Sequence, residues 1–495
     1  MLQLKNPLNG TIPSPMPDIE SVLSNRAVSL RWCAIILAAA TGIAAAVNLI
    51  DVSRLAALPF EMNYEEGNIL NAGVRILHGL SPYPDPHVFP NVLNPYGPVF
   101  YYVTALAVRL GGVSLLLPRV IVIVCALIAA AAIGLLLRLW TKSLPLASAG
   151  AGLFLASPLT YFWMPLLRVD FLALAFAVIG MYFFARERLW WSIPFFALAF
   201  FVKVSSLAAP AACLSFLLFR RDWKRAIRFA LAGIATLAVG FSLAQWLTAG
   251  WFSFHQFSTH GDPFSWRSVV WNLRGLAALD LPQTILSLCF FVMTVADRKA
   301  NLPSLYLLFA TAATVTSGKL GSDSNHLLEL HATLTLCALL ALQELAERVP
   351  AARAAVVLVA CATAWLVFVS QKNPKIVDER AMLRDCGQVY GYVQDTQGDV
   401  LADNVGMLVL TGKPVFVSNP FVLRYLVDRG LSDQQLRDKI ATKGFSTIIL
   451  SGNPMGRPFS DSERWSSGAL AEIKSDYKVI GHAQCTEANT VLVPQ

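Results

Sequence analysis

The chain has 495 residues, of which 56% are hydrophobic and 14% are charged, and its mean hydropathy is +0.56. Soluble globular chains have about 25% charged residues, so this composition excludes an ordinary soluble protein. The formal net charge of +8 does not indicate nucleic acid as a partner, because the basic residues form short clusters between apolar runs. Such clusters are typical of loops held against cytoplasmic membrane lipids, so the sequence predicts a polytopic α-helical membrane protein.

The first predicted span covers residues 30–50 (LRWCAIILAAATGIAAAVNLI) and follows a polar leader, residues 1–29. No small-residue cleavage site stands in the right place, so we expect a retained helix and not a removable signal. Lys5, Arg26 and Arg31 predict a cytoplasmic N-terminus in the plasma (inner) membrane. The next loop, residues 51–97, is therefore expected on the outer, periplasmic face.

Further apolar runs predict about eleven transmembrane helices in total. They lie at residues 119–138, 144–163, 169–185, 189–202, 204–219, 226–248, 281–296, 302–317, 327–342 and 352–370. The segment from Pro98 to Gly112 decides the topology. If this segment does not cross the membrane, all the main basic groups are cytoplasmic, namely the pairs of residues 138–142 and 186–188 and the cluster of residues 220–228. We therefore interpret the segment as re-entrant or short. In the alternative it crosses, and residues 189–219 form one long helix.

The outer loop carries two adjacent carboxylates, Glu65 and Glu66, at the start of a predicted amphipathic helix from Tyr64 to His78 that ends with Arg75 and His78. Residues 79–98 (GLSPYPDPHVFPNVLNPYGP), which include Tyr96, have too many prolines for a helix and are too polar for lipid. We expect this segment, the lid loop, to lie over the membrane surface.

Further polar residues in or beside apolar runs fall on the same outer face. They are Arg168 and Asp170 in LLRVDFLALAF, Lys203 in FFVKVSSLAAP, and Lys319, Asp323, Asn325, His326 and Glu329 in GKLGSDSNHLLEL. Ionisable groups at membrane depth cost at least about 2.5 kcal/mol, so each is a functional candidate. A carboxylate can accept the proton of an attacking alcohol, and Lys and Arg can stabilise a departing phosphate.

Structural explanations compete with each candidate. Adjacent glutamates complement the dipole of a helix N-terminus, an Arg–Asp pair can be a buried structural ion pair, and a lysine at an apolar run can extend to the interface. His255, His260 and Asp262 have a loose metal-like spacing, which is weak evidence for a metal site.

The outer-loop sequence NYEEGNILNAGVRILHGLSPYPD...NPYGPVFYYVTAL resembles that of the GT-C polytopic glycosyltransferases, especially the branch of protein O-mannosyltransferases and aminoarabinose transferases. The resemblance covers roughly residues 30–370. It implies inverting transfer of a sugar from a polyprenyl-phosphate donor to a glycan, lipid or protein acceptor. By position it implies that Glu65 or Glu66 is the base, with Arg168, Lys203 and Lys319 as candidates for the lipid phosphate. The family pair is Asp-Glu and not Glu-Glu, which leaves open which residue is the base and whether a divalent cation, Mg²⁺ or Mn²⁺, assists.

Residues 371–495 predict a small soluble α/β domain on the outer side. The expected strands are VLADN, GMLVLTG, PVFVSN, STIILS and NTVLVP, with a helix over SDQQLRDKIATKG. No phosphate-binding loop is recognisable in this domain, so we expect it to contact the acceptor or a partner. Its two cysteines, Cys386 and Cys485, form a disulfide in one interpretation and remain free thiols in the other.

Two other functions compete with the enzyme. A transporter or flippase for a lipid-linked or amphiphilic substrate needs charges along a path that reaches both membrane faces, whereas these charges gather on one face. A non-catalytic scaffold in an envelope assembly would tolerate neutral substitutions at every candidate residue.

Overall fold

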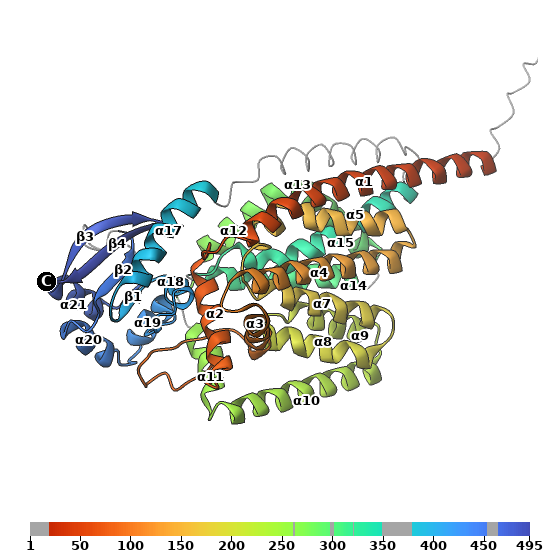
Figure 1. Ribbon diagram of the computed structural model, residues 1–495. Helices are drawn as coiled ribbons and strands as arrows, with labels where there is room; N and C mark the ends of the chain where they lie inside the picture. The colour runs from red at the N-terminus through yellow and green to blue at the C-terminus, as the bar shows by residue number, and fades with distance from the viewer. Residues whose placement is uncertain (1–18, 261–262, 298–300, 320, 349–378, 453–463) are drawn as a thin grey trace, which may run out of the picture.

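The computed structural model describes residues 19–260, 263–297, 301–319, 321–348, 379–452 and 464–495. A bundle of apolar helices forms most of the molecule, and a small α/β domain lies at one end of it (Figure 1). In the first half of the bundle, α1 (Ile19–Ala56) packs along α5 (Leu144–Ala156), while α4 (Leu116–Thr141) contacts both α5 and α7 (Asp170–Ala185). The remaining helices of the bundle are α8 (Leu189–Val202), α9 (Ala208–Phe219), α10 (Trp223–Leu247), α13 (Leu281–Ala296), α14 (Leu302–Ala313) and α15 (Leu328–Arg348).

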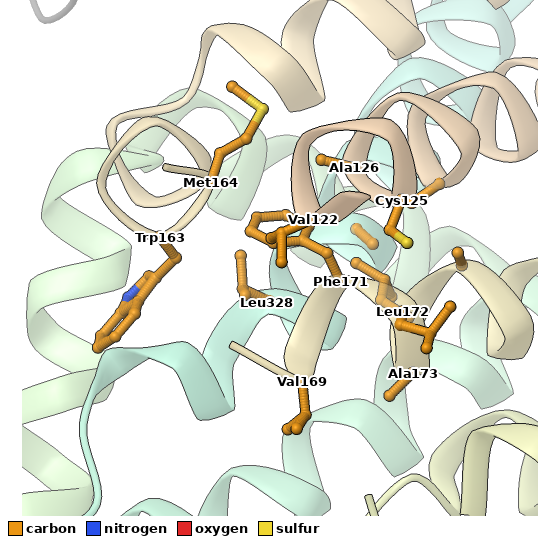
Figure 2. Close-up of a cluster of buried hydrophobic side chains, with 14 of the residues drawn as sticks. Val122, Cys125, Ala126, Trp163, Met164, Val169, Phe171, Leu172, Ala173 and Leu328 are labelled. Atoms are coloured by element: carbon orange, nitrogen blue, oxygen red, sulfur yellow. The ribbon is translucent and has the colours of Figure 1, made fainter. Parts of the chain in front are cut away.

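Small residues allow the closest helix contacts. A Cβ atom added at Gly152 of α5 would lie 2.7 Å from the hydroxyl of Thr41 in α1, so only glycine permits this approach. Close packing through small residues is the usual way in which membrane helices associate. Larger apolar side chains fill the centre, where Val122 of α4 and Phe171 of α7 pack with Leu328 at the start of α15 (Figure 2).

Four helices in the described part of the chain are long and apolar enough to cross a membrane: residues 32–56, 116–141, 223–247 and 324–345. A fifth span results if α12 (Trp266–Leu279) and α13, which meet at 100°, count together. Six further apolar helices are shorter. The chain is thus a multi-pass membrane protein. The predicted run 352–370 lies outside the described residues, and the run 144–163 divides at Ser157 into α5 and α6 (Pro158–Trp163).

The segment that decides the predicted topology is a short helix. It forms α3 (Pro98–Gly111), which is seen end-on in Figure 1, whereas α4, α7 and α8 run across the view. Helix α3 therefore lies across the bundle helices. The alternative of one long helix over residues 189–219 is wrong, because α8 and α9 are separated at residues 203–207.

The C-terminal domain contains one four-stranded sheet in the order β1-β2-β4-β3. Strand β1 (Val400–Ala402) pairs in parallel with β2 (Thr447–Ser451), and β4 (Ala488–Pro494) pairs antiparallel with β2 and with β3 (Tyr477–Gln484). Its helices are α17 (Glu379–Asp395), α18 (Val405–Leu410), α19 (Pro420–Val427), α20 (Gln434–Ala441) and α21 (Ser467–Asp476). Cys386 of α17 and Cys485 form a disulfide, as one of the two interpretations predicts.

Two strand predictions in this domain are wrong. The segment GMLVLTG forms helix α18, and PVFVSN contributes only an isolated bridge between Val417 and Asn91 of the lid loop. Short apolar runs without alternation do not distinguish a strand from a buried helix. Here the run is buried on all sides because α18 packs against α2 (Tyr64–Leu77) of the outer loop.

Candidate active site

The outer-loop helix α2 begins at the pair of glutamates because the preceding residue caps it. The side chain of Asn63 accepts a hydrogen bond of 3.2 Å from the backbone N–H of Glu65. The carboxylate of Glu66 reaches back to accept from the N–H groups of Met62 at 2.7 Å and Asn63 at 3.3 Å. This capping box fixes both glutamates in the first turn and points their side chains in different directions.

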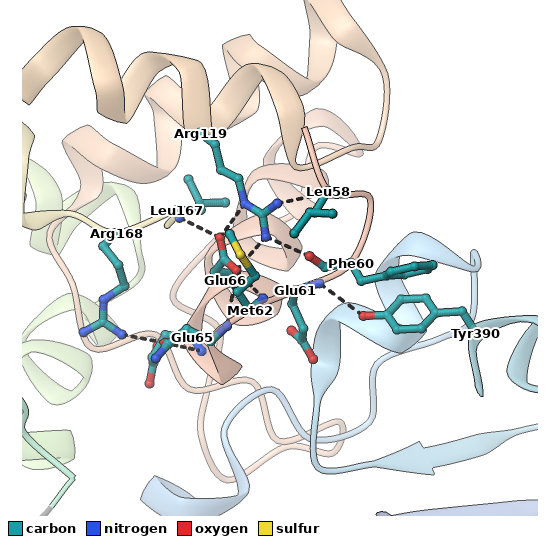
Figure 3. A network of polar contacts seen from close by, with 11 residues as sticks. Leu58, Phe60, Glu61, Met62, Glu65, Glu66, Arg119, Leu167, Arg168 and Tyr390 are labelled. Carbon is teal, nitrogen blue, oxygen red and sulfur yellow. Dashed lines mark hydrogen bonds and ion pairs between the residues drawn. The ribbon is translucent and has the colours of Figure 1, made fainter. Parts of the chain in front are cut away.

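Glu66 is enclosed in the protein interior. Arg119 of α4 forms a two-pronged ion pair with it, Nε to Oε1 and Nη2 to Oε2 at 2.8 Å each, and both side chains are 0% exposed. The N–H of Leu167 adds a hydrogen bond of 2.7 Å to Oε1 (Figure 3). Arg119 also donates to the carbonyl oxygens of Leu58 and Phe60. The contacts with Arg119, Leu167 and the capping N–H groups occupy the Glu66 carboxylate, and the Glu66–Arg119 pair joins α2 to α4.

Glu65 instead lines a cavity of about 300 Å³. Its carboxylate accepts hydrogen bonds from the amide of Asn68 in the same helix, at 3.3 Å, and from the amide of Asn419 in the C-terminal domain, at 2.9 Å. Burial raises the pKa of Glu65 above its ordinary value, although Arg168 nearby and the two amides oppose this effect. Of the two adjacent carboxylates, only Glu65 faces a space that a ligand can fill.

Three cations line the same cavity. Arg168 donates to Asn63 at 3.2 Å, and its guanidinium lies over the rings of Tyr96 and Trp163. Lys203, at the break between α8 and α9, contacts Asp170 at 2.6 Å. Lys319 donates from its Nζ to the carbonyl of His260 at 3.0 Å. The cavity thus combines one carboxylate with three basic side chains.

Asp170 lies beside this cavity, in the wall of a smaller adjoining one, and contacts two of the three cations. Its Oδ1 accepts from Lys203 at 2.6 Å and from the buried amide of Asn325 at 3.0 Å. Its Oδ2 lies 3.7 Å from the Nε of Arg168. His326 also lines the cavity and contacts the hydroxyl of Thr316 at 2.9 Å. Glu329 lies in a smaller adjoining cavity, where it accepts a hydrogen bond from Tyr306.

Three of the candidates lie elsewhere. Arg75 donates to the carbonyl of Ser81 and holds the turn after α2, and His78 is the exposed C-cap residue of that helix. Asp323 is exposed and caps the 3₁₀ helix of residues 324–327. None of the three lines the cavity.

The lid loop contains no helix, and it is held in place by hydrogen bonds. The carbonyl of Tyr96 accepts from the hydroxyl of Tyr83 at 2.6 Å and from Gln256 at 2.7 Å. His255 of α11 (Trp251–Phe257) accepts from the N–H of Asn94 at 3.1 Å and contacts the carbonyl of Pro84 at 2.8 Å. Burial lowers the pKa of His255 to about 4, so its neutral ring can accept at one nitrogen and donate at the other.

The residues of the weak metal-like spacing do not assemble. His255 is engaged by the lid loop, and Asp262 lies outside the described residues. Within the described part of the chain, no three His, Cys, Asp or Glu side chains group closely enough to hold a metal ion.

The C-terminal domain completes the cavity, which the sequence did not indicate. Asn419 and Phe421, beside and within α19, line the cavity together with Glu65. The domain docks where α2 and α18 meet at Gly67 and Gly406; a Cβ atom at Gly67 would lie 2.0 Å from the nitrogen of Gly406. Glu61, fully enclosed beside this contact, accepts a hydrogen bond of 3.0 Å from the N–H of Gly406.

The Glu61→Gln variant is expected to be more stable than the wild type at high pH. Burial, with the nearby charge of Glu66, raises the pKa of Glu61 well above its ordinary value of 4.5. A group with a raised pKa in the folded state stabilises the fold below its ordinary pKa, and this stability is lost as pH rises through the folded-state pKa. Thermal unfolding midpoints of both proteins at about pH 5 and about pH 8 test this. We expect the unfolding midpoint of the wild type to fall more between the two pH values than that of the variant. Equal falls would contradict a raised pKa of Glu61 in the folded protein.

The helical membrane bundle with the small C-terminal α/β domain at one end has the GT-C fold. The structure is similar to that of ArnT from Cupriavidus metallidurans in the apo state, with a TM-score of 0.64 and 13% identity over 91% of this chain and 97% of that one. ArnT bound to undecaprenyl phosphate matches with the same TM-score, 12% identity and the same coverage. The archaeal oligosaccharyltransferase AglB from Archaeoglobus fulgidus, in complex with an inhibitory peptide and a dolichol-phosphate, matches with a TM-score of 0.51 and 8% identity over 88% of this chain and 72% of that one. No family model and no curated protein matches the sequence.

Proposed function

We propose that the protein is a membrane glycosyltransferase that moves a sugar from a polyprenyl-phosphate donor to an acceptor hydroxyl at the outer face of the membrane. The observation that carries this proposal is the single cavity in which Glu65 faces Arg168, Lys203 and Lys319. A base and a group of cations in one enclosure suit a reaction that removes a proton from one oxygen and leaves negative charge on another.

In the proposed reaction, the acceptor oxygen attacks the anomeric carbon of the donor as its proton passes to the Glu65 carboxylate. A bond forms between the acceptor oxygen and that carbon, and the bond from the carbon to the phosphate oxygen breaks. The polyprenyl phosphate leaves with the electron pair. A single displacement from the opposite side inverts the configuration at the anomeric carbon.

The cations act on the leaving group. Arg168, held over Tyr96 and Trp163, can present a planar pair of N–H donors to a phosphate, and Lys203 and Lys319 supply compact charges. The two lipid phosphates bound in the similar structures, undecaprenyl phosphate and dolichol-phosphate, support a donor of this class. The basic cluster of residues 220–228 at the opposite ends of the helices supports placing the cavity on the outer face of an inner membrane.

The proposal is tested with purified protein in lipid, a panel of radiolabelled polyprenyl-phosphate sugars and nucleotide sugars, and membrane extract as acceptor. Transfer from a polyprenyl-phosphate sugar, and from none of the nucleotide sugars, is the expected result. If no donor supports transfer while a lipid-linked substrate crosses the bilayer, the protein is a carrier and the proposal fails.

Asn419→Leu is expected to slow transfer about tenfold or more and to move the acidic side of the pH–rate profile to higher pH. The amide of Asn419 is fixed at both ends, since its oxygen accepts from the N–H of Val422 at 3.1 Å and its nitrogen donates to Glu65. A hydrogen bond to a charged group contributes about 1.5–3 kcal/mol, and this one lowers the pKa of Glu65, so its loss raises that pKa. Gln434→Leu, an exposed position on α20 of the same domain, is the matched control. An unshifted profile in Asn419→Leu would show that the contact does not act on the base.

A further inference from the structure

A second cavity, of about 820 Å³, lies at the other end of helices α7 to α10. Its walls come from the loops that join α7 to α8 and α9 to α10, with the adjoining helix ends. Helix α7, which is 16 residues long, begins with Asp170 beside the first cavity and ends at the second. At 1.5 Å per residue the two cavities are therefore about 24 Å apart, on opposite faces of the bundle.

The lining of this second cavity is strongly basic. Five arginines, Arg188, Arg220, Arg221, Arg225 and Arg228, share it with the two carboxylates of Glu187 and Asp222. Both carboxylates pair with Arg225. For the other four arginines, no ion pair with a carboxylate occurs among the residues that the structure describes. Their positive charge therefore remains available to an anion that enters from outside.

The local backbone keeps these arginines together at the opening. Arg221 and Glu187, at φ 59° and 60°, are non-glycine residues in the left-handed region, a conformation that persists only where the surroundings enforce it. Helix α8 begins at Leu189 without a side-chain cap, so its first N–H groups add partial positive charge to the cavity. The guanidinium of Arg220 lies over the ring of Phe216, 5.4 Å from its centre, which holds it at the wall.

Two tryptophans indicate the kind of anion. Trp190 and Trp191 line the cavity and are 63% and 61% exposed. Exposed indole rings beside arginines are typical of the membrane interface, where the ring contacts the glycerol and upper acyl region while the arginine contacts the headgroup. A free phosphate ion would use the arginines and leave the exposed faces of both rings uncovered.

We propose that this cavity binds the phosphate headgroup of an anionic membrane lipid, with its arginines on the phosphate and its tryptophans against the glycerol and acyl chains. A scattered basic surface would attract anionic lipids only diffusely. Here the arginines line a concavity, so the lipid is expected to remain bound to purified protein. This site is separate from the Glu65 cavity and does not depend on sugar transfer.

The test compares the full-length wild type with the cavity variant Arg220→Gln/Arg221→Gln, both purified in detergent. Each protein is titrated with cardiolipin, with phosphatidylcholine and with inorganic phosphate. Native mass spectrometry and the thermal unfolding midpoint measure binding. Arg138→Gln/Lys142→Gln removes two exposed charges from the end of α4, outside the cavity, and is the matched control. Each arginine near a membrane surface contributes about 1 kcal/mol, so we expect affinity for cardiolipin to fall roughly 30-fold in the cavity variant. Phosphatidylcholine and inorganic phosphate are expected to change the unfolding midpoint little in the wild type and in both variants.

A further variant, Arg220→Lys/Arg221→Lys, keeps the charge and is expected to recover most of the affinity. An unchanged midpoint in phosphatidylcholine establishes that the Gln variant is folded. Equal losses of cardiolipin affinity in the cavity variant and the control would overturn the site in favour of diffuse attraction. Binding of inorganic phosphate as strong as that of cardiolipin would overturn the assignment to a lipid.

Discussion

Glu65→Gln is expected to reduce the rate of sugar transfer by about 10³-fold without loss of folding, because a general base contributes typically 10²–10⁴-fold. Glutamine nearly preserves the shape of the side chain and still accepts a hydrogen bond from Asn419, but it cannot take the acceptor proton. In the wild type, transfer should increase as pH rises through the pKa of Glu65, which burial places above its ordinary value of 4.5. The rate is therefore expected to fall on the acid side, where the carboxyl group is protonated and cannot act as a base.

The measurement is a steady-state rate against pH for the wild type, Glu65→Gln and Glu65→Asp, each with its thermal unfolding midpoint. Glu65→Asp retains a carboxylate on a shorter side chain and should keep more activity than Glu65→Gln. A folded Glu65→Gln protein with wild-type transfer would exclude Glu65 as the base.

Arg119→Met is expected to destabilise the protein by about 3–5 kcal/mol, the usual cost of removing one partner of a buried ion pair. The substitution leaves the Glu66 carboxylate buried beside α4 without its cation and removes the donor to the carbonyl oxygens of Leu58 and Phe60. The free energy of unfolding and the yield of folded protein in detergent measure the effect.

Arg109→Met, at an exposed position in the last turn of α3, is the control and should change stability little. The double variant Arg119→Met/Glu66→Leu removes both charges and should regain part of the lost stability, because no buried charge remains without a partner. A single Arg119→Met protein as stable as the wild type would contradict the structural role assigned to the Glu66–Arg119 pair.

Much of the membrane part follows from its composition and periodicity. The runs 189–202 and 281–296 coincide with α8 and α13, and the lid loop is free of helix as its prolines require. Arg168, Asp170 and Lys203 were recognisable because ionisable groups are costly at membrane depth. Arg168 and Asp170 are neighbours in the chain, and the structure brings Lys203 from a different segment to Asp170.

The rest depends on contacts that local patterns do not encode. The glutamate pair looks symmetrical in the sequence. The two residues differ in the structure because Arg119 comes from another helix to bind Glu66, whereas Asn419 comes from the C-terminal domain to bind Glu65. Arg119 itself carried a signal, an arginine close to the start of an apolar run, which could have marked it as buried. Asn419 carried none, since an asparagine before a Pro-Phe-Val segment is an ordinary helix cap, and its contact with Glu65 spans most of the chain.

The position of Asn419 and Phe421 also sets the order in which a newly made chain becomes complete. The membrane helices and the outer loop leave the ribosome first, and the cavity then has Glu65 but no wall from α19. That wall arrives only after α19 has been synthesised and the C-terminal domain has docked at Gly67. A truncated or stalled chain would therefore have Glu65 in an open cavity, and the complete cavity forms only when the C-terminal domain has been made.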